Sequence, residues 1–265
     1  MTTANHVVLV HGTWGSGPFW TEARAAFEAR GFTVHTPTLR HHELPLLAGA
    51  TEVATVSLTD YTDDLVELCE SLDSPPLLVG LSMGGLLVQL TAARTATAGV
   101  VAACPAPAAG IFQLYPSMVR LFSRHFLQSR PWAKPLYPTW EAWSWGVANT
   151  QTPQLAREMF AGLVCESGRA YCEMAFPWLD RRRAARVDFG AVTSPVLVIA
   201  GEKDRVVVPA ICRATASRYP GSTYVEIPQS DHMVLFGNAL PVTMGHIDKW
   251  LQGHDIANDA YARTE

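Results

Sequence analysis

One pentapeptide limits what this chain can fold into more than any other feature, and it is Gly80-Leu81-Ser82-Met83-Gly84. Residues 77–79 before it are apolar, like a buried strand, and residues 83–93 after it follow a helical pattern. A serine between a strand and a helix must lie on a tight, strained turn, where glycine avoids a collision between a Cβ and neighbouring backbone. The sequence therefore predicts a nucleophile elbow that holds Ser82 clear of the edge of a sheet.

Short apolar runs alternate with helical patterns along most of the chain. Strands separated by helices need right-handed crossovers, so this alternation predicts the α/β class, with a doubly wound, mostly parallel sheet. The expected strands are residues 7–10, 33–36, 77–79, 100–104, 195–200 and 222–227. The expected helices are residues 18–30, 61–72, 83–93, 211–219 and 238–251.

The alternation stops between the fourth and fifth of these strands. This stretch is helical in pattern, rich in proline and aromatic residues, and holds five of the eight tryptophans. We interpret residues 105–187 as an inserted helical cap, and residues 1–104 and 188–265 as the core. A cap in this place lies above the C-terminal edge of the sheet, where such folds bind ligands. Its aromatic residues either line the substrate site or pack the cap against itself. The expected substrate contacts are Trp14, Trp140, Trp143 and Trp178.

The composition fits one large folded unit. The chain has 265 residues, 48% hydrophobic and 17% charged, which is enough for a single core with an insertion. Its formal net charge of −4 provides no basic surface for nucleic acid. No apolar run approaches the roughly 20 residues that span a bilayer, so no membrane partner is expected.

The N-terminal pattern and the cysteine pattern predict a cytoplasmic protein. The apolar run at residues 7–10 is too short for a signal peptide, and no basic segment precedes it. Five cysteines are an odd number and form no C-x-x-C pair, which favours buried thiols in a reduced compartment over disulfides or zinc ligands. We therefore expect no metal, and a monomer or a homodimer.

A serine hydroxyl becomes a nucleophile when a base lies within hydrogen-bond reach and a carboxylate orients that base. If the chain order is serine, aspartate, histidine, the base is one of three histidines that follow Asp204. His246 lies within the expected closing helix and His254 in the polar tail, whereas His232 follows an expected strand by a short loop. That loop leaves the sheet edge that also carries the nucleophile, so we expect His232 to be the base.

The carboxylate that orients this base has one preferred candidate. Asp204 closes the segment Gly201-Glu202-Lys203-Asp204, directly after the expected strand 195–200. Glu202 could take the same role, and Asp204 would then be an ordinary turn aspartate. Asp231 is disfavoured because adjacent residues rarely face each other, and residues 105–109 after the neighbouring strand contain no carboxylate.

Acyl transfer also needs hydrogen-bond donors for the negative oxygen of the tetrahedral intermediate. The segment His11-Gly12-Thr13-Trp14-Gly15-Ser16-Gly17 follows the first strand and leads into a helix. We expect the backbone N–H of Thr13 and that of Met83, directly after the nucleophile, to be these donors. His11 is expected to hold the loop rather than take part in the chemistry.

These segments carry a resemblance. HG near the N-terminus, GLSMGG, GEKDRVVVP and SDHM, in this order, resemble the α/β-hydrolase superfamily over essentially the whole chain outside the cap. The chain is most similar to the methylesterase and hydroxynitrile lyase branch, because His11 comes after a single strand and leaves no room for a leading hairpin. The resemblance implies a Ser-His-Asp hydrolase with a lid, no cofactor, and a small-molecule ester as substrate.

Several residues discriminate within that superfamily. Haloalkane dehalogenases and epoxide hydrolases use an aspartate nucleophile, which Ser82 argues against. Hydroxynitrile lyases of this branch carry a threonine after the first-strand histidine and a lysine after the catalytic one, where this chain has Gly12 and Met233. Hydrolysis of an apolar or aromatic ester through an acyl-enzyme is therefore favoured. Hydrolysis of a lactone, thioester or C–C bond stays open, as do perhydrolase activity and a ligand receptor on the same fold.

Overall fold

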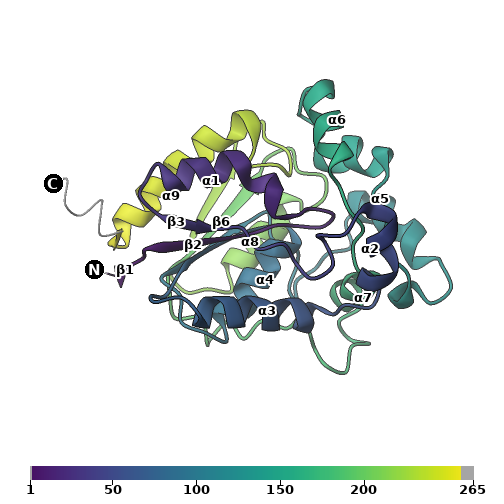
Figure 1. The fold of residues 1–265 in the computed structure, drawn as a ribbon, viewed down its shortest axis with the longest axis horizontal. Coiled ribbons are helices and arrows are strands. Elements are labelled where there is room, and N and C mark those ends of the chain that lie inside the picture. The colour runs from purple at the N-terminus through teal and green to yellow at the C-terminus, as the bar shows by residue number, and fades with distance from the viewer. Residues whose placement is uncertain (1, 258–265) are drawn as a thin grey trace.

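The computed structural model describes residues 2–257 and has the predicted α/β architecture (Figure 1). A six-stranded sheet has the order β3-β2-β4-β5-β6-β7, and every pairing in it is parallel. The two central strands, β4 and β5, are buried at every residue, as expected for a sheet covered on both faces. The six strands are β2 (His6–Val10), β3 (Thr33–His35), β4 (Leu77–Leu81), β5 (Gly99–Ala103), β6 (Val196–Gly201) and β7 (Thr223–Ile227). A separate two-stranded sheet pairs β1 (Thr2–Thr3) with β8 (Ile256–Ala257).

Helices cover both faces of the sheet, which confirms the doubly wound prediction (Figure 1). On one face lie α1 (Thr21–Glu28) and α9 (Leu240–Gly253). On the other face lie α3 (Leu58–Glu70), α4 (Met83–Ala92) and α8 (Pro209–Ala216).

Two predicted helices have different ends in the structure, because capping side chains and a glycine turn determine where they start and stop. The helix α3 begins at Leu58 because Ser57 and Asp60 form a reciprocal capping box, in which the Asp60 N–H donates to Ser57 Oγ at 3.0 Å. The segment expected as one helix over residues 18–30 starts as a 3₁₀ turn, η1 (Gly17–Trp20), and α1 ends at Glu28. Gly31 then turns the chain towards β3 with a φ of 85°, a conformation that favours glycine.

The segment between β5 and β6 carries most of the remaining helices, and it lies beyond one end of the sheet (Figure 1). We call residues 105–187 the cap segment. Its buried apolar side chains, such as Phe122 and Tyr171, belong to the same hydrophobic cluster as those of the sheet. That these residues form a unit of their own stays a prediction. The helical elements are α5 (Pro116–Phe126), η2 (Pro131–Ala133), η3 (Ala142–Val147), α6 (Pro153–Ala161) and α7 (Gly168–Ala175), where η3 is a π-helix.

One helix packs against the cap segment from elsewhere in the chain. The helix α2 (Leu46–Val53) lies beside it in Figure 1, and the sequence did not predict it. Its apolar residues Ala50 and Val53 form a small cluster with Cys165, whose thiol donates to the Leu46 carbonyl at 3.2 Å. The cap segment therefore packs against an earlier part of the chain as well as against the sheet.

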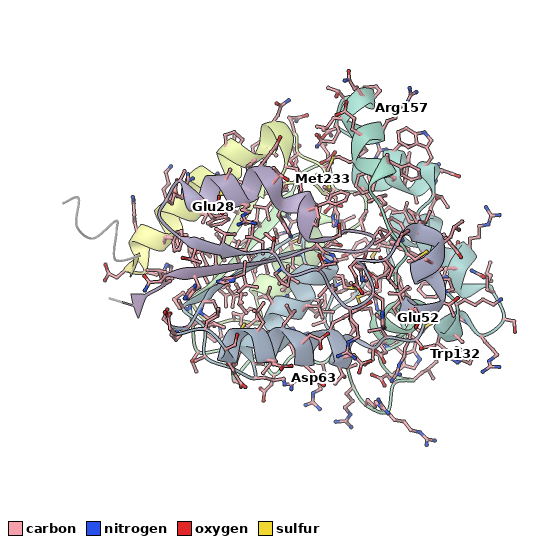
Figure 2. All side chains as sticks on the ribbon, viewed as in Figure 1. Glu28, Glu52, Asp63, Trp132, Arg157 and Met233 are labelled. Atoms are coloured by element: carbon pink, nitrogen blue, oxygen red, sulfur yellow. The ribbon has the colours of Figure 1, made fainter. Side chains whose placement is uncertain are left out.

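The labelled Glu28, Asp63 and Arg157 are among the charged side chains that lie at the periphery of the molecule (Figure 2). Trp132 also projects outward from the cap segment and is half exposed, whereas Met233 is buried. Within residues 2–257, no helix combines the length and the apolar character needed to cross a membrane.

Candidate active site

Ser82 lies on the turn between β4 and α4, as the sequence predicts. Its φ of 59° and ψ of −121° belong to a region that residues with a side chain rarely occupy. Gly80 and Gly84 permit the turn, because a Cβ on Gly80 would collide with the Gly84 carbonyl and one on Gly84 with the Val10 carbonyl. The strained backbone is held by close packing, and it leaves the serine at the C-terminal edge of the sheet.

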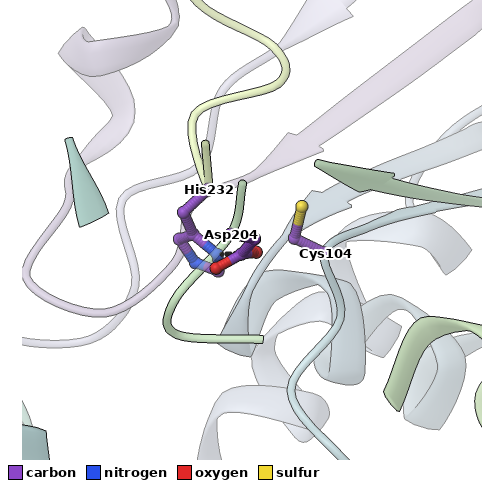
Figure 3. A group of neighbouring side chains, drawn as sticks. All are labelled: Cys104, Asp204 and His232. Atoms are coloured by element: carbon purple, nitrogen blue, oxygen red, sulfur yellow. Dashed lines mark hydrogen bonds and ion pairs between the residues drawn. The ribbon is translucent and has the colours of Figure 1, made fainter. Parts of the chain in front are cut away.

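Asp204 and His232 meet at the same edge, from the loops after β6 and β7 (Figure 3). The Nδ1 of His232 lies 2.6 Å from Asp204 Oδ2, and both side chains are buried. The other carboxylate oxygen of Asp204 accepts from the N–H groups of Val206 at 2.7 Å and Val207 at 2.9 Å. His232 and Ser82 line the same cavity. Because Nδ1 of His232 is engaged by the carboxylate, its Nε2 is the nitrogen available for a hydrogen bond in that cavity.

The two alternative carboxylates, Glu202 and Asp231, are engaged elsewhere. Glu202 is a surface residue that accepts from the Gln229 N–H at 2.8 Å. Asp231 is buried, and it accepts from the N–H groups of Thr150 at 2.9 Å and Met233 at 3.0 Å. Of the carboxylates that the sequence offered, Asp204 is the one in contact with the imidazole.

The loop after β2 packs directly against the nucleophile. A Cβ on Gly12 would lie 2.8 Å from the Ser82 Cβ and 2.8 Å from the Leu81 carbonyl oxygen, so only glycine fits. Thr13 therefore lies beside Ser82, and the two residues share the walls of two cavities. Met83 opens α4, and the first amides of a helix have no acceptor within it. Both predicted oxyanion donors are thus at the nucleophile.

His11 holds this loop, as expected. Its Nε2 accepts from the Leu39 N–H at 3.0 Å, so the ring proton is on Nδ1 and is donated to the Gly12 carbonyl at 2.9 Å. Burial and the nearby His42 lower the pKa of His11 to about 3, which keeps the ring neutral. A neutral ring with both nitrogens occupied has a structural role.

The cap segment also holds the loop. Trp14 has a φ of 65°, which is unusual for a residue with a large side chain. Its carbonyl accepts from the Val164 N–H at 2.9 Å, and its indole N–H donates to the Leu136 carbonyl at 3.0 Å. These two contacts keep Trp14 in a conformation that it would rarely adopt alone.

Two narrow cavities meet at Ser82, each of about 50 Å³, which is room for a few water molecules. The residues common to both are Thr13, Ser82, Phe122, Tyr171 and Val206. We call the first the histidine cavity; its other lining residues include Trp14, Trp143, Val147, His232 and Phe236. We call the second the methionine cavity; its other lining residues include Ala106, Gln113, Met118, Met174 and Val207. Apolar side chains dominate both walls.

A family model described as "Alpha/beta hydrolase family" matches residues 7–242. The chain belongs to the alpha/beta hydrolase family. It is 27% identical over 246 residues to Methylesterase 3 of Arabidopsis thaliana, a match that covers 87% of this chain and 90% of that protein. The resemblance to the methylesterases seen in the motifs is confirmed.

Solved structures agree on the fold. A monoacylglycerol lipase of Paleococcus ferrophilus superposes with a TM-score of 0.66 at 20% identity, over 96% of this chain and 97% of that one. A thermophilic esterase from Thermogutta terrifontis gives a TM-score of 0.67 at 21% identity, over 96% and 92% of the two chains. At these identities the likeness establishes the architecture of this alpha/beta hydrolase.

The four tryptophans expected to contact substrate divide into two pairs. Trp14 and Trp143 are buried and line the histidine cavity. Trp140 and Trp178 are 40% and 70% exposed and line neither cavity at Ser82, so these cavities do not support their assignment as substrate contacts, which stays a prediction. Their rings instead make edge contacts with a phenylalanine each, at 5.4 Å and 5.8 Å, on the outside of the hydrolase.

A buried ion pair behind the loop after β2 was not predicted. His42 Nε2 lies 3.1 Å from Glu166 Oε2, and neither side chain is exposed. The other Glu166 oxygen accepts from Tyr61 OH at 3.0 Å and from the Ser167 N–H at 2.6 Å. Burial alone would lower the pKa of His42, but the charge and hydrogen bond of Glu166 outweigh it and raise that pKa. The His42 ring also lies 5.1 Å from the His11 ring, so the pair joins the cap segment to the loop.

Cys104, Asp204 and His232 bring donor atoms within 4.8 Å of one another (Figure 3). The Asp204 carboxylate is already engaged by His232 and two amides. Burial, and then the charge of Asp204, raise the pKa of the Cys104 thiol well above its usual value, so the sulfur keeps its proton. Because the carboxylate is engaged and the thiol is protonated, we assign no metal to this group.

Proposed function

We propose that this alpha/beta hydrolase is a serine esterase that cleaves a small carboxylic ester through an acyl-enzyme on Ser82. One observation carries the proposal: the 2.6 Å contact between His232 Nδ1 and Asp204, with His232 and Ser82 in the wall of one cavity. This arrangement is what a serine needs in order to become a nucleophile.

Each residue then has one task. His232 Nε2 takes the proton of Ser82 as its Oγ attacks the ester carbonyl, and the amides of Thr13 and Met83 donate to the negative oxygen that forms. His232 returns the proton to the leaving alcohol, and a water activated by the same imidazole releases the acid. Asp204 fixes the imidazole tautomer and stabilises the imidazolium.

The cavities favour a short, apolar ester. Each has about 50 Å³ of free space, so the groups next to the ester carbonyl must be narrow. Aromatic and aliphatic side chains line them, among which are Trp143, Phe236 and Met174. The similarity to a plant methylesterase supports an ester as the bond that is cleaved.

The test combines a probe and a substrate panel. A fluorophosphonate should label the native protein once, and Ser82→Ala should abolish labelling without changing the melting temperature. The same protein is then assayed with p-nitrophenyl esters of increasing acyl length, with lactones and with thioesters. Undiminished labelling of the variant would refute the role of Ser82. An unlabelled native protein would favour a receptor, and turnover restricted to lactones or thioesters would replace the ester assignment.

A further inference from the structure

Thr13 lines both cavities at Ser82, and its side chain carries a hydroxyl group. Thr13 Oγ1 is 2.8 Å from the hydroxyl of Tyr171, which α7 of the cap segment contributes. Both residues belong to the small set that lines the histidine cavity and the methionine cavity alike, together with Ser82. A pair of hydroxyls therefore lies at the junction of two mostly apolar cavities.

The two hydroxyls of Thr13 and Tyr171 carry one more proton than their mutual contact uses. Two hydroxyls in contact use one proton between them, and the second proton stays available. Within residues 2–257, neither hydroxyl has another hydrogen-bond partner. Either hydroxyl can be the donor at this distance, and the phenol is the more acidic of the two, which favours donation from Tyr171 to Thr13 Oγ1. The proton of Thr13 is then free to point into the cavity.

The position of Thr13 determines which substrate atom this proton meets. Gly12 packs so closely against Ser82 that a Cβ added to it would lie 2.8 Å from the Ser82 Cβ. Thr13 follows Gly12 in the chain, so it lies beside the nucleophile. Its amide is the first proposed oxyanion donor, and its hydroxyl belongs to the same residue. We infer that the Thr13 hydroxyl is a third donor to the oxyanion, and that Tyr171 of the cap is a positioning residue that orients it.

This inference rests on the proposed esterase function and adds no covalent step. When Ser82 Oγ bonds to the carbonyl carbon, the C=O electron pair moves to oxygen, which then accepts hydrogen bonds from two amides and one hydroxyl. The Thr13 proton stays on Thr13 throughout. The contribution appears in the transition state, where the charge develops, more than in the bound substrate.

The experiment uses the full chain and the p-nitrophenyl ester that the native enzyme hydrolyses best. Thr13→Val should lower kcat about 10- to 100-fold and leave KM within about threefold, because one of three donors is lost. Thr13→Ser should restore kcat to within about threefold of native, since its hydroxyl can occupy the same position. The matched control is Thr215→Val, which removes a buried hydroxyl from α8 that lines neither cavity at Ser82. It should leave kcat unchanged.

A second variant and a second measurement protect the inference from a folding artefact. Tyr171→Phe should lower kcat about three- to tenfold, and adding it to Thr13→Val should cause little further loss, because both act on one proton. A trifluoromethyl ketone, which forms a tetrahedral adduct with the serine, should bind each variant more weakly by the factor lost in kcat/KM.

Two outcomes would overturn the inference while the proposed function stands. One is a Thr13→Val enzyme with native kcat; the other is equal losses in Thr13→Ser and Thr13→Val, which would indicate packing rather than a hydroxyl. If Thr13→Val does not fold, a fully active Tyr171→Phe enzyme overturns it. A native protein that no fluorophosphonate labels would instead refute the proposed function, and this inference with it.

Discussion

The loops after β6 and β7 hold their functional side chains differently from the cap segment. In the loops, the backbone positions the side chains: two consecutive amides orient Asp204, and the neighbouring parallel strand brings His232 next to it. The cap segment is joined to the rest of the site by contacts between side chains, such as Glu166 with His42 and Tyr171 with Thr13. The proposed chemistry therefore depends on the local geometry of strand ends, and the walls of the two cavities depend on long-range polar contacts. Each region should respond differently to substitution.

The largest effect should come from the sheet edge. Asp204→Asn should lower kcat by roughly 10³- to 10⁴-fold, because the amide favours the wrong imidazole tautomer, and it should leave the melting temperature nearly unchanged. The control is Glu202→Gln, two residues away on the surface, which should leave kcat as it is. If the two variants exchanged these results, the acid would be Glu202, and the 2.6 Å contact would have no catalytic role.

The position of Asp204 was predictable because it follows from a pattern. Strands β4, β6 and β7 have short apolar runs, and parallel strands bring their carboxyl ends to one edge, so Ser82, Asp204 and His232 had to converge. The helix α2 and the ion pair of His42 with Glu166 left no such trace. The two partners are 124 residues apart, and no period or motif links them.

The second prediction tests the cap side of the comparison. Glu166→Gln removes the charge that raises the pKa of His42, so the buried pair loses its ionic hydrogen bond, and the free energy of unfolding should fall by about 1.5–3 kcal/mol. The control is Glu141→Gln, which breaks an exposed pair with Arg120 at 3.3 Å and should cost little. Urea unfolding measures both. Equal costs would show that the buried pair does not fasten the cap.

The same pair makes a prediction about pH. Because the native state raises the pKa of His42, it binds that proton more tightly than the unfolded chain does. The stabilisation is therefore complete below the unfolded value of about 6.5 and is lost as the pH rises through the native pKa. His11 has the opposite sign: with its pKa lowered to about 3, stability falls as the pH drops from 6.5 towards 3. Between pH 6.5 and 9, the native melting temperature should fall more steeply than that of Glu166→Gln. Parallel slopes would contradict the assignment.

The smallest effects are expected on the outer surface of the cap, and they show where substrate contact ends. Trp140 and Trp178 are 40% and 70% exposed, so Trp140→Ala and Trp178→Ala should leave the melting temperature and the order of preferred esters close to native. Trp143 is the matched control, because it lines the histidine cavity and its indole N–H donates to the Ala156 carbonyl at 2.8 Å. Trp143→Ala should cost about 3–5 kcal/mol and shift the preferred ester, since the space next to the nucleophile grows. A shifted preference in Trp178→Ala, with native stability, would mean that the substrate reaches the outer surface of the cap and that the two cavities at Ser82 describe only part of its binding site.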